Sequence, residues 1–199
     1  MLIPQIKYSS DTSTQQLVQS IKHWSLFGQV AIIGIDATAV DDVKSILRQV
    51  GGTVDISIDF ASSDAAEQLA MLNEGACRLL NRDSSQDSET VPSDRQINLI
   101  ENPPLDQAIP QNTLVALDSP TASRIAELEM ARIDCLVDIE HLSPELITDY
   151  FKTVLVTDRT DGLWSTVIVD PIGIALGLAY SNYESLLHAI ETRCGTYWS

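Results

Sequence analysis

Positive charge is scarce in this chain of 199 residues. Lys and Arg together number 12, whereas Asp and Glu together number 28, so the formal net charge is −16. This charge repels phosphate backbones and anionic lipid headgroups. The composition therefore argues against a nucleic-acid partner and against a membrane-surface partner.

Cysteine and long apolar runs are scarce as well. Cys77, Cys135 and Cys194 are far apart and none belongs to a CxxC pair, which is not the pattern of a secreted disulfide framework. Residues 1–5 lack the basic segment and apolar run of a signal peptide. No apolar run approaches the ~20 residues that span a bilayer. We therefore expect a cytoplasmic protein with reduced thiols.

Several familiar catalytic motifs are missing. The sequence contains no Walker-type phosphate loop, no GxSxG elbow and no GxGxxG fingerprint. His23 and His188 are isolated. His141 lies near Cys135 and Asp138, but alternation along a strand places those two on opposite faces. We expect no metal site in this chain.

The first three quarters of the chain alternate between strand and helix patterns. Residues 29–35 (QVAIIGI) form an apolar run typical of a strand covered on both faces. Such alternation predicts parallel strands joined by right-handed crossovers. A partial or degenerate (βα)-barrel is the best fit, and an open doubly wound sheet is the alternative. The other predicted strands are residues 53–60, 76–80, 97–100, 113–117, 133–139 and 154–156. The helices between them are predicted to begin at Thr38, at Ser62 or Ser63, at Ser119-Pro120 and at Ser143-Pro144.

Two connections have no periodicity. Residues 83–96 (DSSQDSETVPSDRQ) are polar and predict a surface loop, and residues 102–112 hold three prolines.

The pattern changes at about Val154. Residues 166–170 and 174–180 are strands separated by a Pro-Ile-Gly turn, which predicts an antiparallel hairpin. Ser181 and Glu184 form a predicted capping box for the next helix. Residues 196–199 begin a further strand with two aromatic side chains. Because nothing follows to cover them, we expect the natural unit to be longer.

Three motifs in this last part carry a resemblance. TDRTDGLW at residues 157–164, LGLAYS at 176–181 and GTYWS at 195–199 occur in this order. Together they resemble the opening of the phosphoribosyl-AMP cyclohydrolase domain, as it is arranged in fungal multifunctional proteins of histidine biosynthesis. The resemblance covers roughly residues 156–199. It implies an α/β domain of unknown role at residues 1–153 and a truncated α+β cyclohydrolase-like segment (antiparallel hairpin, helix, strand) at 154–199.

The resemblance also implies a chemistry. Members of this family open the purine ring of phosphoribosyl-AMP by adding water to the N1–C6 bond. They bind zinc through cysteines and magnesium through aspartates, and both metal motifs follow the position of the YWS segment. Cys194 does not match a family metal ligand. The expectation is therefore a part of a histidine-biosynthesis enzyme whose chain alone is inactive, with zinc and magnesium belonging to the complete domain.

The residues of this chain that match the family motifs could contribute only to the positioning of substrate. Arg159 could form a fork to a phosphate group, or an Arg–Asp pair that rigidifies a turn. The two terminal aromatics could line a nucleotide pocket or pack in a sheet, and the sheet is the stronger expectation. The substrate-binding candidates are Asp158, Arg159, Asp161, Tyr197, Trp198 and Ser199.

Two alternatives of other classes stay open. One is a non-catalytic binding or assembly module, with a homodimer that buries Tyr197 and Trp198. The other is a phosphosugar-binding α/β domain, because four aspartates follow predicted strands and active sites of βα-barrels lie at the carboxyl ends of their strands. Capping of the following helices is the stronger expectation for these aspartates. They are Asp36, Asp59, Asp118 and Asp138.

Overall fold

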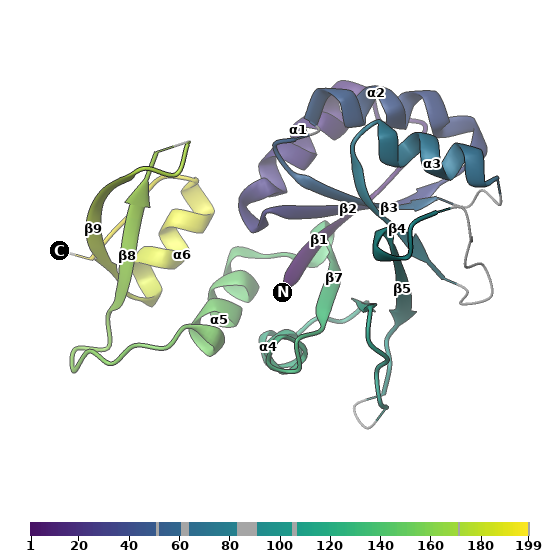
Figure 1. Ribbon diagram of the computed structural model, residues 1–199. Coiled ribbons are helices and arrows are strands. Elements are labelled where there is room, and N and C mark those ends of the chain that lie inside the picture. Colours follow the sequence, from purple (N-terminus) through teal and green to yellow (C-terminus); the bar gives the residue numbers. More distant parts are fainter. Residues whose placement is uncertain (51, 61–63, 83–90, 105–106, 171, 199) are drawn as a thin grey trace. The chain divides into compact units, whose positions relative to one another are not determined.

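The computed structural model describes residues 1–50, 52–60, 64–82, 91–104, 107–170 and 172–198 (Figure 1). The chain divides into two compact units: a barrel unit, Met1–Pro120 with Leu128–His141, and a hairpin unit, Thr121–Glu127 with Leu142–Ser199. The division at residue 153 that the sequence suggests stays a prediction. No described helix has both the length and the apolar character needed to cross a membrane.

The barrel unit is built on seven parallel strands that close on themselves. Each strand pairs with the next along the chain, and β1 pairs with β7, where Ile3 lies opposite Leu136. This closure confirms the barrel-like α/β fold, and the open doubly wound sheet is wrong. The strands are β1 (Leu2–Lys7), β2 (Gln29–Ile35), β3 (Asp55–Phe60), β4 (Ala76–Asn81), β5 (Gln96–Glu101), β6 (Thr113–Leu117) and β7 (Asp134–Asp138).

The buried apolar side chains of the barrel strands form two separate clusters. Alternate side chains point into the barrel. They form one buried cluster of Ile3, Ala31, Leu80, Ile97, Leu99, Leu114, Ala116 and Leu136. The intervening side chains of β1 to β4 pack against helices, in a second cluster that includes Ile21, Ile32, Ile46, Leu47, Ile56, Ile58 and Met71.

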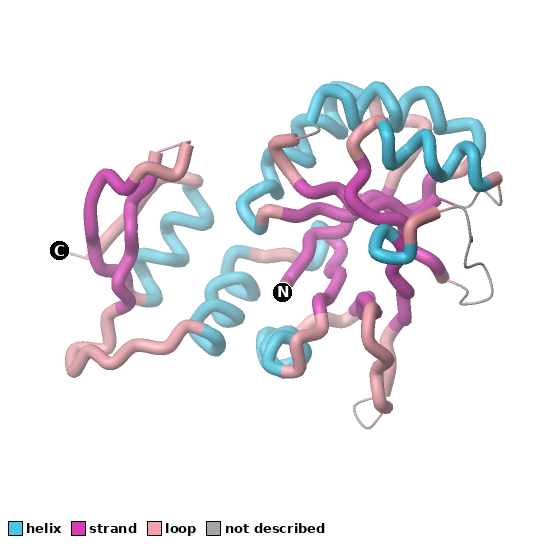
Figure 2. The backbone as a smooth tube through the Cα atoms, viewed as in Figure 1, coloured by secondary structure: helices cyan, strands magenta, loops and turns pink. Residues whose placement is uncertain are grey.

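The helical cover of the barrel is uneven, as Figure 2 shows. Helices α1 (Thr14–Trp24), α2 (Val40–Val50) and α3 (Ala65–Asn73) connect β1 to β4, and α4 (Ala122–Met130) connects β6 to β7. Within the described residues, the connections on either side of β5 contain no α-helix, only the short 3-10 helix Ser93–Arg95. This agrees with the two irregular connections predicted there, of which residues 83–90 and 105–106 lie outside the described residues.

The hairpin unit contains α5 (Pro144–Val154), β8 (Trp164–Val169), β9 (Ala175–Ser181) and α6 (Tyr183–Thr192). Strands β8 and β9 pair antiparallel, with Val167 opposite Leu178, as the sequence predicts. Helices α5 and α6 pack together, and the Lys152 ammonium lies 5.4 Å from the centre of the Tyr183 ring. A single bridge adds Trp198 to β9 at Tyr180.

Two sequence predictions about elements are wrong, and one strand was missed. The predicted strands do not include β1, in which Pro4 lies opposite Val137. No strand covers residues 154–156, because Val154 completes α5 and Leu155 caps that helix. The terminal strand at 196–199 is reduced to the Trp198 bridge within the described residues.

The helix caps also shift along the chain. The capping box of α6 uses Asn182 and Ser185, while the hydroxyl of Ser181 lies 2.8 Å from that of Thr166 on the neighbouring strand. Asp64 caps α3, and the predicted caps Ser62 and Ser63 lie outside the described residues. For α4, the hydroxyl that accepts a backbone N–H belongs to Thr121 and not to Ser119. Ser143 caps α5 as predicted.

The barrel interior predicts a large effect of truncation. Leu114 is fully buried in the inner cluster, so Leu114→Ala should lower the free energy of unfolding by about 2–5 kcal/mol. Leu69→Ala is the matched control, because Leu69 is 39% exposed on α3, and should change it by under about 1 kcal/mol. Urea denaturation followed by circular dichroism measures both. Equal losses would contradict the assignment of Leu114 to a closed interior.

Candidate functional site

The loop between α5 and β8 is held in shape by its own hydrogen bonds. The Thr157 hydroxyl donates to the carbonyl of Leu163 at 2.7 Å, and the N–H of Gly162 donates to the carbonyl of Arg159 at 3.1 Å. Gly162 has φ = +73°, a conformation that glycine adopts at little cost. The TDRTDGL sequence therefore forms a compact turn that presents Arg159.

Arg159 and Asp161 form a two-pronged ion pair inside this turn. Nε and Nη2 of Arg159 lie 2.9 and 2.5 Å from the two carboxylate oxygens of Asp161. The hydrogen bond from Arg159 is the main cause that holds the pKa of the Asp161 carboxyl below its usual value, and the N–H of Leu163 adds to it. The pairing expected as the alternative to phosphate binding is thus present in the structure.

Tyr180 on β9 joins this turn to the end of the chain. The guanidinium carbon of Arg159 lies 4.1 Å from the centre of the Tyr180 ring. The backbone carbonyl of Tyr180 accepts the N–H of Trp198 at 2.7 Å. The structure therefore gathers Arg159, Asp161 and Trp198 around Tyr180, and we call these four residues the Tyr180 cluster. Sequence reasoning missed Tyr180, although it stands within the LGLAYS motif.

The other predicted site residues lie outside this cluster. The Asp158 side chain is exposed. Tyr197 folds back over Gly195, where an added Cβ would lie 2.5 Å from the Tyr197 hydroxyl. Tyr197 and Trp198 are 38% and 54% exposed, and Trp198 bridges to β9 at Tyr180. The packing of these aromatics in a sheet stays a prediction. Ser199 lies outside the described residues.

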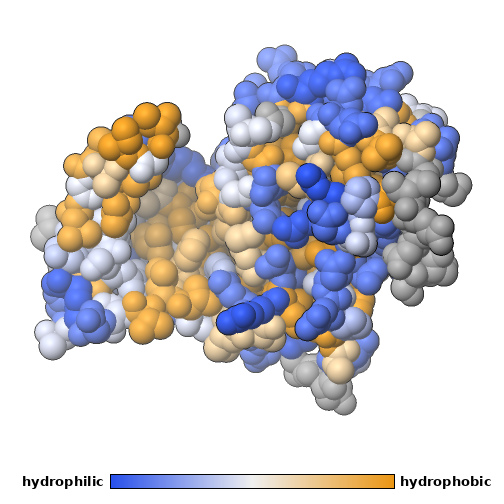
Figure 3. Space-filling model, in the orientation of Figure 1, coloured by the Kyte–Doolittle hydropathy of each residue, from blue (hydrophilic) through white to orange (hydrophobic). Residues whose placement is uncertain are grey.

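An apolar face covers the hairpin beside the Tyr180 cluster. Alternate residues of β8 and β9 expose large aliphatic side chains, and Figure 3 shows the hydrophobic colour gathered over this hairpin. Residues 163–169 and 172–179 contain no ionisable side chain. The apolar hairpin face consists of Val167, Val169, Ile172, Ile174, Leu176 and Leu178, each more than half exposed.

A second group of charged residues lies at the carboxyl ends of the barrel strands. Pairing between β4 and β5 ends where Asn81 lies opposite Asn98, so β5 extends beyond β4. The Arg82 side chain bridges this gap, donating from Nε to Asp59 at 2.7 Å and from Nη1 to Glu101. Sequence reasoning missed both residues: Arg82 directly follows β4, and Glu101 ends β5.

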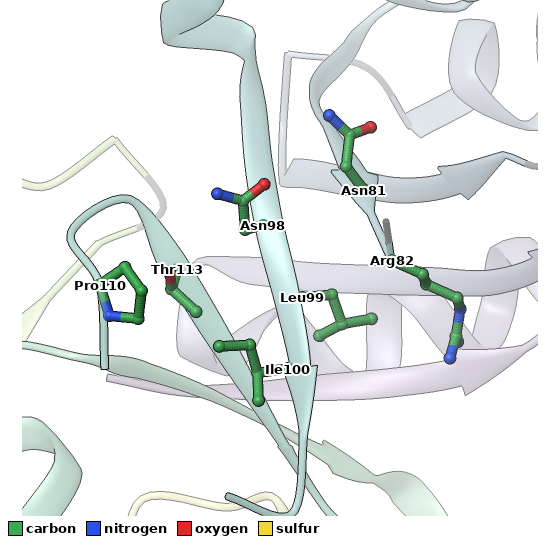
Figure 4. A pocket seen from close by; sticks show the side chains of 7 residues that line it. All are labelled: Asn81, Arg82, Asn98, Leu99, Ile100, Pro110 and Thr113. Atoms are coloured by element: carbon green, nitrogen blue, oxygen red, sulfur yellow. The ribbon is translucent and has the colours of Figure 1, made fainter. Parts of the chain in front are cut away.

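Two cavities adjoin Arg82. One of about 180 Å³ is bounded by the side chains in Figure 4, where Asn98 and Ile100 lie on one side of β5 and Leu99 on the other. The second, of about 400 Å³, is lined by Arg82, Leu99, Ile100 and Glu101. Because two carboxylates already pair with Arg82, this end of the barrel has little attraction for an anion.

The strand-end aspartates are separately engaged. Asp36 accepts the N–H and the hydroxyl of Thr38 and caps the 3-10 helix Ala37–Ala39. Asp138 accepts the N–H of Glu140, and Asp118 accepts the amide of Asn102. Asp36 and Asp138 thus bond to backbone N–H groups two residues further along the chain. This is the local capping role that was the stronger expectation. None of the hydrogen bonds within the described residues joins two of the four aspartates.

The described residues do not supply a metal site. No group of three or more His, Cys, Asp or Glu side chains in that part of the chain is arranged to hold a metal ion. The donor set therefore does not fit zinc or magnesium, and no chemical step is assigned to a metal on these residues.

Relatives of known name are fungal histidine-biosynthesis proteins. The chain is 29% identical over 175 residues to the histidine biosynthesis trifunctional protein of Kluyveromyces lactis and 26% identical to that of Saccharomyces cerevisiae. These matches cover 87% and 88% of this chain but 20% and 21% of the relatives. A histidine biosynthesis bifunctional protein of Schizosaccharomyces pombe is 54% identical over 43 residues, 22% of this chain and 10% of that protein. The chain thus spans about a fifth of the length of the trifunctional relatives. No protein-family model matches it.

The Arg159–Asp161 pair predicts a response to acid. Because the pKa of Asp161 is lowered, the pair should persist above the ordinary aspartate pKa of about 3.9 and break as the pH falls through the lowered value. The Nε–H resonance of Arg159 in nitrogen-15 NMR should therefore lose its protection against exchange only in strong acid. Asp161→Asn should weaken it at every pH, while Asp158→Asn should leave it unchanged. An acid response that survives in Asp161→Asn would contradict the assignment.

Proposed function

We propose that this chain is the N-terminal part of a histidine-biosynthesis enzyme that hydrolyses phosphoribosyl-AMP in the cytoplasm. The sequence similarity to fungal histidine-biosynthesis proteins supports the pathway. The reaction is proposed from the TDRTDGLW, LGLAYS and GTYWS motifs. A match of 43 residues at 54% identity has about the length of the segment that carries them.

The Tyr180 cluster is the observation that carries the proposal. Its four members come from all three motifs. The Arg159 guanidinium pairs with Asp161 and lies over the Tyr180 ring, and the Tyr180 carbonyl accepts the N–H of Trp198. Because Asp161 uses only one edge of the guanidinium, Arg159 keeps further N–H donors for a substrate phosphate. In this proposal Arg159 only positions the substrate, because the metal-binding motifs that the resemblance implies for the complete domain are not among the motifs of this chain.

The chain alone is therefore expected to be inactive. Purified 199-residue protein with zinc and magnesium should not open the ring of phosphoribosyl-AMP, as followed by ultraviolet absorbance. The native polypeptide, isolated from its source with an antibody to this chain, should hydrolyse it and should have a mass far above 21.8 kDa. Turnover by the purified chain would contradict the expected inactivity. A native mass near 21.8 kDa would contradict the proposed enzyme.

A binding or assembly module is the second candidate, and the apolar hairpin face favours it. A chain with a net charge of −16 repels its own copies, but this face is free of charge. Pairing two such faces would remove apolar side chains from water, which is favourable by about 25 cal/mol per Å². A homodimer formed through this face would suit the assembly role.

The second candidate predicts a dimer that depends on the hairpin. Light scattering after size exclusion should then give twice the 21.8 kDa of one chain, and Leu178→Asp should return the protein to a monomer. Met130→Asp is the matched control, because Met130 is 74% exposed on α4, and it should leave the dimer intact. A monomeric wild type at all concentrations, or a dimer that tolerates Leu178→Asp, would exclude this candidate.

A further inference from the structure

We infer that Tyr180 is a positioning residue that fixes Arg159 so that one edge of its guanidinium faces a phosphate group of the substrate. This inference rests on the proposed function, since it assumes that the Tyr180 cluster contacts phosphoribosyl-AMP. Tyr180 itself is not assigned a contact with the reacting atoms. Its role is to hold the cation that does make contact.

The hydrogen bonds of Arg159 define which edge is available. A guanidinium has five N–H groups in one plane. Asp161 accepts from Nε and from Nη2, so the side edge of the group is occupied. The end edge, formed by Nη1 and the second hydrogen of Nη2, is the pair of donors that a phosphate or a carboxylate can meet with two oxygens.

The Tyr180 ring fixes the remaining freedom of this group. The ion pair with Asp161 alone would let the guanidinium swing with the exposed carboxylate, because both side chains are partly exposed. The ring lies 4.1 Å from the guanidinium carbon and restricts that motion. The cation is thus held from two directions.

The backbone of Tyr180 is itself held on both sides. On one side β9 pairs with β8, where Ser165 lies opposite Tyr180. On the other side the N–H of Trp198 donates to the Tyr180 carbonyl. A ring mounted on a strand residue whose backbone is hydrogen-bonded on both edges is a firmer support than one on a loop. The turn that carries Arg159 and the segment that carries Trp198 therefore both contact the same residue of β9.

The charges around Arg159 predict that a phosphate group alone binds to it weakly. Asp161 neutralises much of the Arg159 charge, and Asp158 lies next to it in the sequence. Inorganic phosphate should therefore bind with low affinity, and a nucleotide should bind more tightly because its base and sugar add contacts. A carboxylate has the same pair of oxygens with less charge, so acetate separates a phosphate site from a general anion site.

The test is an NMR titration of the 199-residue chain that follows the Arg159 guanidinium resonances. Inorganic phosphate, AMP and acetate are the probes. AMP and phosphate should shift the Arg159 signals saturably, and acetate should not. Tyr180→Leu should weaken AMP binding about three- to fivefold, the range expected for one exposed cation–π contact, while Tyr180→Phe should keep binding within about twofold of wild type.

Tyr183→Leu is the matched control. Tyr183 also carries a cation over its ring, Lys152 at 5.4 Å, but it belongs to α6 and lies outside the Tyr180 cluster. Its loss should leave AMP binding unchanged. Thermal unfolding of each variant separates a loss of binding from a loss of folding, and the rescue by phenylalanine separates positioning from a general structural role.

The outcomes distinguish the inference from the proposal beneath it. If neither phosphate nor AMP shifts Arg159 in the wild type, the proposed substrate contact fails and the role of Tyr180 fails with it. If AMP binds but Tyr180→Leu binds equally well, or Tyr183→Leu weakens binding as much, only the positioning role of Tyr180 is overturned. An acetate response equal to that of phosphate would overturn the phosphate assignment.

Discussion

The pairing of β1 with β7 is the constraint on which the barrel depends. Four consecutive residue pairs join the two strands, from Leu2 with Cys135 to Gln5 with Asp138. The α-amino group of Met1 adds an ion pair to Asp134 at 2.7 Å. Without this pairing, β1 and β7 would be open edges, and the inner cluster would lose the strands that enclose it. The first and the last barrel strands of the sequence thus close the barrel around its inner cluster.

Most of the barrel could be predicted from the sequence, and the reason is local. Strands such as residues 29–35 and 113–117 are apolar throughout because both of their faces are buried, and this signal does not depend on distant contacts. The first strand could not be recognised in the same way. Pro4 weakens its strand pattern, and only the pairing of β1 with β2 and β7 shows that this proline is tolerated there. Closure itself is a tertiary property, so the sequence left the barrel and the open sheet as alternatives.

The candidate site shows the same limit more sharply. Arg159 and Asp161 are two residues apart, and their pairing could be anticipated from spacing alone. Tyr180 and Trp198 could not be linked to them, because that link depends on how the hairpin turns back along β8. The same holds for Arg82, whose two carboxylate partners stand on strands separated by more than 40 residues of chain, from Asp59 to Glu101. Sequence patterns identified Arg159, Asp161 and Trp198 as candidates but not their arrangement, and they missed Tyr180, Arg82 and Glu101.

Because positive charge is scarce in this chain, the way in which Arg159 is paired sets it apart from other arginines. In a chain with 12 basic and 28 acidic side chains, arginines find carboxylates readily, as Arg48, Arg82 and Arg124 each do. Arg82 donates hydrogen bonds to two separate carboxylates and lies between them, so its role is to link neighbouring strands. Arg159 meets a single carboxylate on one edge and an aromatic ring on its face, so its charge is held in place without every donor being used. In the proposed site, the orientation of this cation therefore comes from the ring and not from a second carboxylate.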